Sequence, residues 1–187
     1  MNQLSNYIKS YIDVEEKELN SILSCFSKQV MPKNKFVLKK GQLVTYYYFI
    51  CSGGFVIYDM KNDIQSIRYF AFENEFITDI SKIKSGGRTE SYIKTLEETT
   101  VYTISHKKME EMYNRFPIWE RFGRLVWENA FESVLHAIHG FQSLNAKERY
   151  LILLKRSDLI NRVPLKDLSL FLGITPSSLS RIRKEIV

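Results

Sequence analysis

Cysteine is scarce in this sequence: Cys25 and Cys51 are the only two among 187 residues. So few thiols exclude a disulfide-rich scaffold and any iron–sulfur or metal site that needs four cysteines from one chain. Long apolar runs are also missing, since none approaches the ~18 residues that a membrane helix needs. Charged residues interrupt the first twenty positions every few residues, so no signal-peptide core is present. We therefore expect a cytoplasmic protein that has no membrane partner.

Histidine is absent from residues 35–104, and the chain has only His106, His136 and His139. Metal chemistry on a small β barrel needs clustered His and Glu side chains on its strands, so a cupin-like enzyme is excluded. His136 and His139 are spaced as a helical metal pair would be, but a third ligand is lacking. The sequence also shows no nucleophile–base group and no phosphate-cradling glycine loop. We expect no catalytic residue, no metal site, no cofactor and no enzyme activity.

Basic residues outnumber acidic residues mainly at the C-terminal end of the chain. Residues 144–187 contain nine Lys and Arg against four Asp and Glu, whereas the other residues contain 18 against 17. A basic end on a nearly neutral body favours a polyanion as the partner of that end. The alternative is an ordinary solvated surface with surplus lysine.

The pattern of apolar residues changes twice along the chain. Residues 4–29 have helical spacing, and residues 35–104 contain short segments rich in β-branched and aromatic residues. Gly41, the Ser52–Gly54 group and the KNDI segment at 61–64 separate these segments as turns would. Such spacing predicts a small β sandwich or barrel with helices on either side.

Helical spacing returns from Lys107, and Pro117 stands where the first turn of a long helix would begin. This helix is apolar on two sides, so it needs two partners. One partner is expected to be the β domain and the other the same helix of a second subunit. We place that dimer seam at Trp119, Phe122 and Val126. The alternative is a wholly buried helix in a monomer.

The last 44 residues predict a helix-turn-helix. Asn145 and Glu148 have capping-box spacing, Gly173 suits the turn between two helices, and Thr175-Pro176 suits the start of the second. Apolar residues stand at the positions that would lock the pair together, and small Ser169 stands where the helices would cross. The other face of the second helix offers groups that reach phosphates and base edges. The predicted DNA contacts are Thr175, Ser177, Ser178, Ser180, Arg181 and Lys184. The alternative is a helical hairpin within a core.

The order of these parts resembles the Crp/Fnr family of bacterial transcription regulators over nearly the whole chain. The segment ERYLILLKRSDLINRVPLKDLSLFLGITPSSLSRIR is similar to that of the short branch common in Bacteroidetes. The resemblance implies an α+β fold: a cyclic-nucleotide-binding-like β roll (a double-stranded β-helix) flanked by helices, a long dimerisation helix, and a C-terminal winged-helix/helix-turn-helix domain. The domains would be residues 1–116, 117–141 and 142–187. The implied partners are double-stranded DNA with a palindromic operator, a second copy of the chain, a small-molecule effector and RNA polymerase.

The effector region departs from the family members that bind cyclic AMP. Their phosphate cassette has a Gly-Glu pair followed by an Arg, and the matching positions here are Glu75 and, for the Arg, Thr89 or the adjacent Arg88. Glu90 adds a negative charge beside the expected phosphate, which disfavours an anion. We therefore predict a regulator whose effector, if any, is not cyclic AMP, with Glu75, Arg88 and Thr89 as pocket candidates. The alternative is a ligand-binding or protein-interaction module of this fold that has lost regulated DNA binding.

Overall fold

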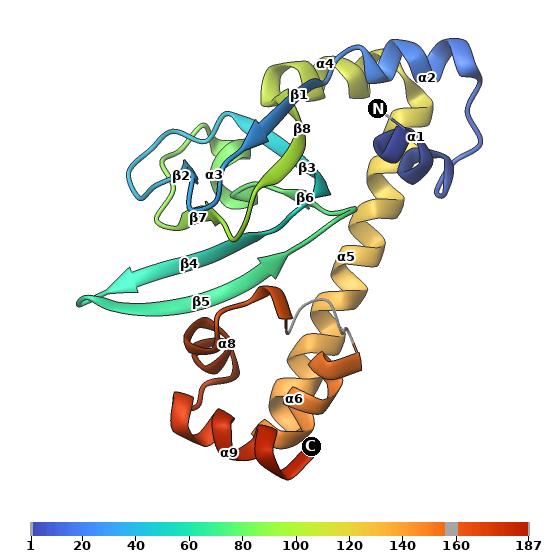
Figure 1. Ribbon diagram of the computed structural model, residues 1–187. Coiled ribbons are helices and arrows are strands. Elements are labelled where there is room, and N and C mark those ends of the chain that lie inside the picture. The colour runs from blue at the N-terminus through green and yellow to red at the C-terminus, as the bar shows by residue number, and fades with distance from the viewer. Residues whose placement is uncertain (1, 156–160, 187) are drawn as a thin grey trace. The chain divides into compact units, whose positions relative to one another are not determined.

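The computed structural model describes residues 2–155 and 161–186 (Figure 1). Within them the chain forms two compact units. The first comprises the chain up to Ile57 together with Phe70–Ala130, and the second comprises Tyr58–Tyr69 together with the chain from Phe131 onward. No described helix is both long enough and apolar enough to cross a membrane.

Two four-stranded sheets form the β domain, as the short alternating segments predict. One sheet has the order β1 (Ser27–Met31), β8 (Thr99–Ser105), β3 (Tyr46–Ser52), β6 (Phe76–Ile77). The other has the order β2 (Phe36–Leu38), β7 (Tyr92–Thr95), β4 (Phe55–Lys61), β5 (Ile64–Ala71). A short helix, α3 (Ile80–Ser85), follows β6. Sequence neighbours such as β7 and β8 lie in different sheets, which is typical of a roll rather than of a simple meander.

The interior of the roll is filled by the chain's own side chains. Alternate residues of β3 point to opposite sides, because Tyr48 and Ile50 join the interior cluster while Phe49 joins the outer one. The interior cluster draws on both sheets and on α3. Its buried members are Met31, Leu38, Val44, Tyr48, Ile50, Phe55, Ala71, Ile77, Ile83, Ile93 and Val101.

A second cluster lies between the outer side of the β1–β8–β3–β6 sheet and four helices. These are α1 (Asn2–Lys9), α2 (Glu16–Leu23), α4 (His106–Arg115) and the start of α5 (Pro117–Ser143), which Figure 1 shows gathered at one end of the first unit. Trp119 and Phe122 of α5 stack with ring centroids 4.6 Å apart and are almost fully buried here. The start of α5 at Pro117 confirms the predicted first turn.

Two turns contain residues that suit the unusual backbone conformation found there. Asn62 and Asp63 both have positive φ and join β4 to β5, which confirms the predicted hairpin at KNDI. Gly53 has φ +90°, and a Cβ there would lie 2.5 Å from Thr99 Oγ1. Only glycine meets both demands at position 53.

The C-terminal part consists of helices α6 (Ala146–Lys155), α8 (Leu165–Leu172) and α9 (Pro176–Ile186). The predicted capping box is confirmed: the Asn145 N–H donates to Glu148 Oε2 at 2.7 Å, and the Glu148 N–H donates to Asn145 Oδ1 at 3.1 Å. The continuation of that helix expected from the sequence falls on residues 156–160, outside the described residues. The described residues beyond α5 include no strand of a wing.

Candidate DNA-binding surface and effector region

Helices α8 and α9 are held together as the sequence predicts. Leu168, Leu172 and Leu179 are buried between them, and Ser169 is fully buried where a larger side chain would separate the helices. Gly173 ends α8 with φ +71°, the left-handed conformation expected of the turn. The Ser178 N–H then donates to Thr175 Oγ1 at 3.1 Å, which caps α9.

The predicted DNA-contacting residues share one side of the start and body of α9. Thr175, Ser177, Ser180, Arg181 and Lys184 are exposed, while Ser178 is half-buried. The Thr175 hydroxyl lies 2.9 Å from the hydroxyls of both Ser177 and Ser178, which links the three at the helix N-terminus. We call these six residues the α9 face.

One acidic residue of α9 is neutralised within the same unit. Lys147 Nζ lies 2.8 Å from Glu185 Oε2, and this hydrogen bond and charge lower the pKa of Glu185. The pairing joins α6 to α9 and reduces repulsion between Glu185 and an incoming polyanion.

The dimer seam expected at Trp119, Phe122 and Val126 needs correction. Trp119 and Phe122 are 1% and 2% exposed because α1, α2 and α4 cover them, and Val126 is half-buried against the same cluster. These side chains already have a partner within the chain. The exposed apolar residues of α5 lie further along and are 47–65% exposed. They are Trp127, Phe131, Val134, Leu135, Ile138 and Phe141, which we call the α5 stripe.

Thr89, at the position of the family's arginine, is fully buried and satisfied within the chain. Its hydroxyl donates to Asp79 Oδ2 at 2.7 Å and accepts from the Ser91 N–H at 3.0 Å. Asp79 precedes α3, and its other oxygen accepts from Ser81 at 2.8 Å. A carboxylate thus already occupies the hydrogen-bonding position beside residue 89, where it repels an anion.

The other two pocket candidates do not join Thr89 in one cavity. Arg88 is exposed and donates from Nη1 to the Gly41 carbonyl at 2.7 Å. Glu75 is close to Tyr7 on α1, whose pKa is raised by burial, by its hydrogen bond to Tyr11 and by the nearby Glu75 carboxylate. Thr89, Arg88 and Glu75 therefore each lie beside a different partner within the chain: Asp79, Gly41 and Tyr7.

Asp79 was not among the residues expected from the sequence to form the effector region. Its position just before a short helix is a signal for an N-cap, yet its side chain makes no cap hydrogen bond and instead binds Thr89. Only the approach of residue 89 to α3 gives it this partner. Among the described residues, no three His, Cys, Asp or Glu side chains gather as a metal site would require.

Comparison with known proteins adds to this geometry. Residues 28–116 match the family described as "Cyclic nucleotide-binding domain". This part of the chain is similar to that domain. The match covers β1 to α4, which includes both sheets of the roll. A search of curated proteins finds no match to the chain.

Solved structures of similar fold extend beyond the matched residues. FixK2 from Bradyrhizobium japonicum has a TM-score of 0.70 at 16% identity, over 86% of this chain and 84% of that one. A CooA mutant from Carboxydothermus hydrogenoformans has a TM-score of 0.69 at 16% identity, over 94% and 85%. The Thermus thermophilus catabolite activator protein has a TM-score of 0.56 at 16% identity, over 94% and 85%.

These likenesses confirm the predicted α+β fold and the resemblance to Crp/Fnr regulators. They cover the roll, the long helix and the C-terminal helices together, because each extends over at least 86% of this chain. The relation to the branch common in Bacteroidetes stays a prediction.

Proposed function

We propose that this protein is a homodimeric transcription regulator of the Crp/Fnr type that acts in the cytoplasm and reads a palindromic operator. The α9 face carries the proposal. It combines exposed hydroxyls at a capped helix N-terminus with Arg181 and Lys184 on the same helix. Such a helix enters the major groove with its N-terminal residues at the base edges.

Each residue of the α9 face has a role that follows from its chemistry. Arg181 is the candidate for bidentate contact with guanine O6 and N7. Ser177, Ser178 and Ser180 are candidates for base edges or phosphates, and Thr175 for a phosphate beside the helix N-terminus. Lys184 is a candidate for a phosphate contact that carries no sequence information.

The α5 stripe supports the homodimer. Trp127, Phe131, Val134, Ile138 and Phe141 follow one another at intervals of four, three, four and three residues. That is the a/d spacing of a coiled-coil seam, and two copies would bury each other's stripe about a two-fold axis. Two symmetric α9 helices would then read two half-sites.

The effector of this regulator, if it has one, is proposed to be a small molecule other than cyclic AMP. The observations in support are the filled roll interior and the Asp79 carboxylate at Thr89. RNA polymerase is the expected protein partner of a regulator of this type.

Selection from random DNA tests the proposal. The full-length protein is incubated with a library of random duplexes, and the bound molecules are enriched and sequenced. We expect a palindromic consensus, with a binding constant that falls steeply as salt concentration rises. The variant Arg181→Ala is selected in parallel, and it should lose the base preference at one position of each half-site.

The second candidate function is a module of this fold that binds a ligand or a protein but no longer DNA. The Asp79 carboxylate at Thr89 leaves room for it, since this carboxylate disfavours a cyclic phosphate as the signal that regulates DNA binding. If random-duplex selection yields no consensus while the protein remains dimeric, this second function replaces the first.

A further inference from the structure

An open hollow lies on the β domain where the turn after β2 meets the segment before β7. Its volume is about 470 Å³. The turn is fixed by backbone bonds, since the Gly41 N–H donates to the Thr89 carbonyl at 2.8 Å and the Thr89 N–H to the Gln42 carbonyl at 2.9 Å. Side chains and backbone of Val37, Gly41, Gln42, Leu43, Tyr46 and Arg88 line it.

The hollow combines apolar side chains with a strong cation. Leu43 is 51% exposed and Tyr46 is 45% exposed, and neither has a place in the two buried clusters. Arg88 borders them and uses Nη1 to hold the Gly41 carbonyl. A guanidinium has five N–H donors in a planar fork, so this bond leaves capacity for an incoming carboxylate.

Several lysines precede the lining residue Gly41 closely in the sequence. The segment 33–40 contains Lys33, Lys35, Lys39 and Lys40 and no acidic residue. Lys39 and Lys94 both lie over the ring of Phe36, at 4.8 Å and 5.9 Å from its centroid. The nearby Glu90 forms an ion pair with Lys40 at 3.1 Å.

We propose that this hollow docks an acidic segment of another protein that carries one large apolar side chain. The apolar side chain would enter between Leu43 and Tyr46, and flanking carboxylates would meet Arg88 and Lys39. Arg and Tyr are among the residues that anchor protein interfaces, and basic clusters recognise acidic motifs. The hollow falls in the size range of pockets that enclose a compact group.

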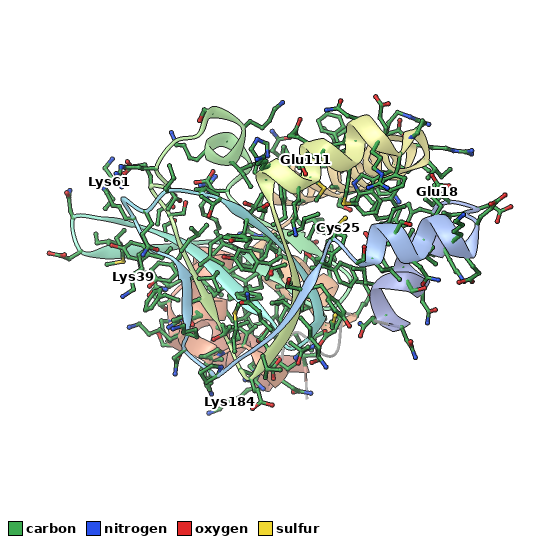
Figure 2. All side chains as sticks on the ribbon, turned by 90° about the horizontal axis from the view of Figure 1, so that it is seen from above. Glu18, Cys25, Lys39, Lys61, Glu111 and Lys184 are labelled. Atoms are coloured by element: carbon green, nitrogen blue, oxygen red, sulfur yellow. The ribbon has the colours of Figure 1, made fainter. Side chains whose placement is uncertain are left out.

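Duplex DNA fits this hollow less well than an acidic protein segment does. Phosphate groups need only a row of cations along the backbone, and they make no use of the exposed Leu43 and Tyr46 side chains. A protein segment uses both these side chains and the cations. The residues concerned belong neither to the α9 face nor to the α5 stripe, so the docking goes beyond the proposed regulation of DNA. Figure 2 shows Lys39 at the end of the β domain away from Glu18 of α2.

The test uses the full-length protein and short synthetic peptides with a fluorescent label. The main probe is a Glu- and Asp-rich peptide with one central tryptophan, titrated while fluorescence anisotropy is recorded. Comparison peptides replace the tryptophan by serine or the acidic residues by lysine. We expect binding of the main probe and at least about fivefold weaker binding of each comparison peptide.

Variants of the protein locate the site. Arg88→Glu and Lys39→Glu should each weaken peptide binding by about fivefold or more, and Leu43→Ser should weaken binding of the tryptophan peptide alone. Lys17→Glu on α2 makes the same change of charge away from the hollow and should leave binding unchanged. Val30→Thr is the matched control for Leu43→Ser, since Val30 is exposed on β1. Circular dichroism and the melting temperature check that every variant folds.

Three results would overturn the proposal. One is no binding of the acidic tryptophan peptide by the folded protein. Another is an equal loss of peptide affinity in Lys17→Glu and Arg88→Glu, which would mean that the peptide is held by general charge attraction. The third is a DNA duplex of random sequence that competes away the peptide and loses affinity with Arg88→Glu, which would assign the hollow to nucleic acid.

Discussion

The Thr89 hydroxyl donates a 2.7 Å hydrogen bond to Asp79 Oδ2, and Thr89 has no exposed surface. This one contact joins the segment before β7 to the start of α3. It also places a carboxylate beside one of the residues expected to line an effector pocket. The bond therefore bears on both the stability of the roll and its ligand.

Cyclic nucleotides should not stabilise the protein. A cyclic phosphate near Thr89 would face the Asp79 carboxylate and the exposed Glu90. We expect no change in melting temperature with cyclic AMP or cyclic GMP in a thermal-shift titration. A ligand present at 100 times its Kd would add about 2.7 kcal/mol, so a bound nucleotide would be seen. A clear rise with either nucleotide would contradict our account of this region.

Asp79→Ala should lower the free energy of unfolding by roughly 1–3 kcal/mol, because the buried Thr89 hydroxyl loses its acceptor. Thr89→Val removes the same bond from the other side. In a double-mutant cycle measured by urea unfolding, the double variant should lose less free energy of unfolding than the sum of the losses in the two single variants. Ser81→Ala is the control, since its hydroxyl is exposed, and it should change stability by no more than about 0.5 kcal/mol. Additive effects would show that Asp79 acts independently of Thr89.

Val134→Glu on the α5 stripe should convert the dimer to a monomer, because two copies would bury unpaired carboxylates against each other. Sedimentation velocity at several concentrations measures the change. His136→Glu is the matched control, because His136 is exposed on the opposite side of the same helix. A dimer that persists in Val134→Glu would rule out the α5 stripe as the seam.

Phe122→Ala should instead damage the fold of each chain. Its ring packs on Trp119 and beside Tyr7 and Tyr11 within one core cluster, and it is 2% exposed. Loss of such a buried ring costs about 3–5 kcal/mol of stability. Thermal or urea unfolding should show this loss at every protein concentration. A loss of stability confined to low protein concentration would instead indicate that Phe122 lies in the subunit interface.

Arg181→Ala and Lys184→Ala should affect DNA binding in different ways. Loss of Arg181 should cost about 1–3 kcal/mol on the selected operator and little on random duplex, whereas loss of Lys184 should weaken both alike. Anisotropy titrations with both duplexes at several salt concentrations measure this, and the Lys184 variant should show a smaller salt slope. Equal losses on both duplexes for Arg181→Ala would exclude it as a base contact.

The turns and caps followed from the sequence because each depends on neighbouring residues only. Asn145 with Glu148, Thr175 with Ser178, and the Asn62-Asp63 hairpin all form as their spacing predicts. The positions of the α9 face follow from the same local rule of helical periodicity.

The placing of side chains far apart in the sequence was decided by tertiary structure. The periodicity of α5 showed two apolar sides but not that α1, α2 and α4 cover Trp119 and Phe122 and leave the α5 stripe exposed. Likewise, the cassette residues are near one another in sequence, yet Glu75 turns toward Tyr7 while Thr89 turns toward Asp79. Sequence alone determined the elements, their caps and the basic C-terminal end, because these depend on local spacing and composition. The packing of distant elements decided which apolar face stays open and which carboxylate meets Thr89, because that depends on how the whole chain fills space.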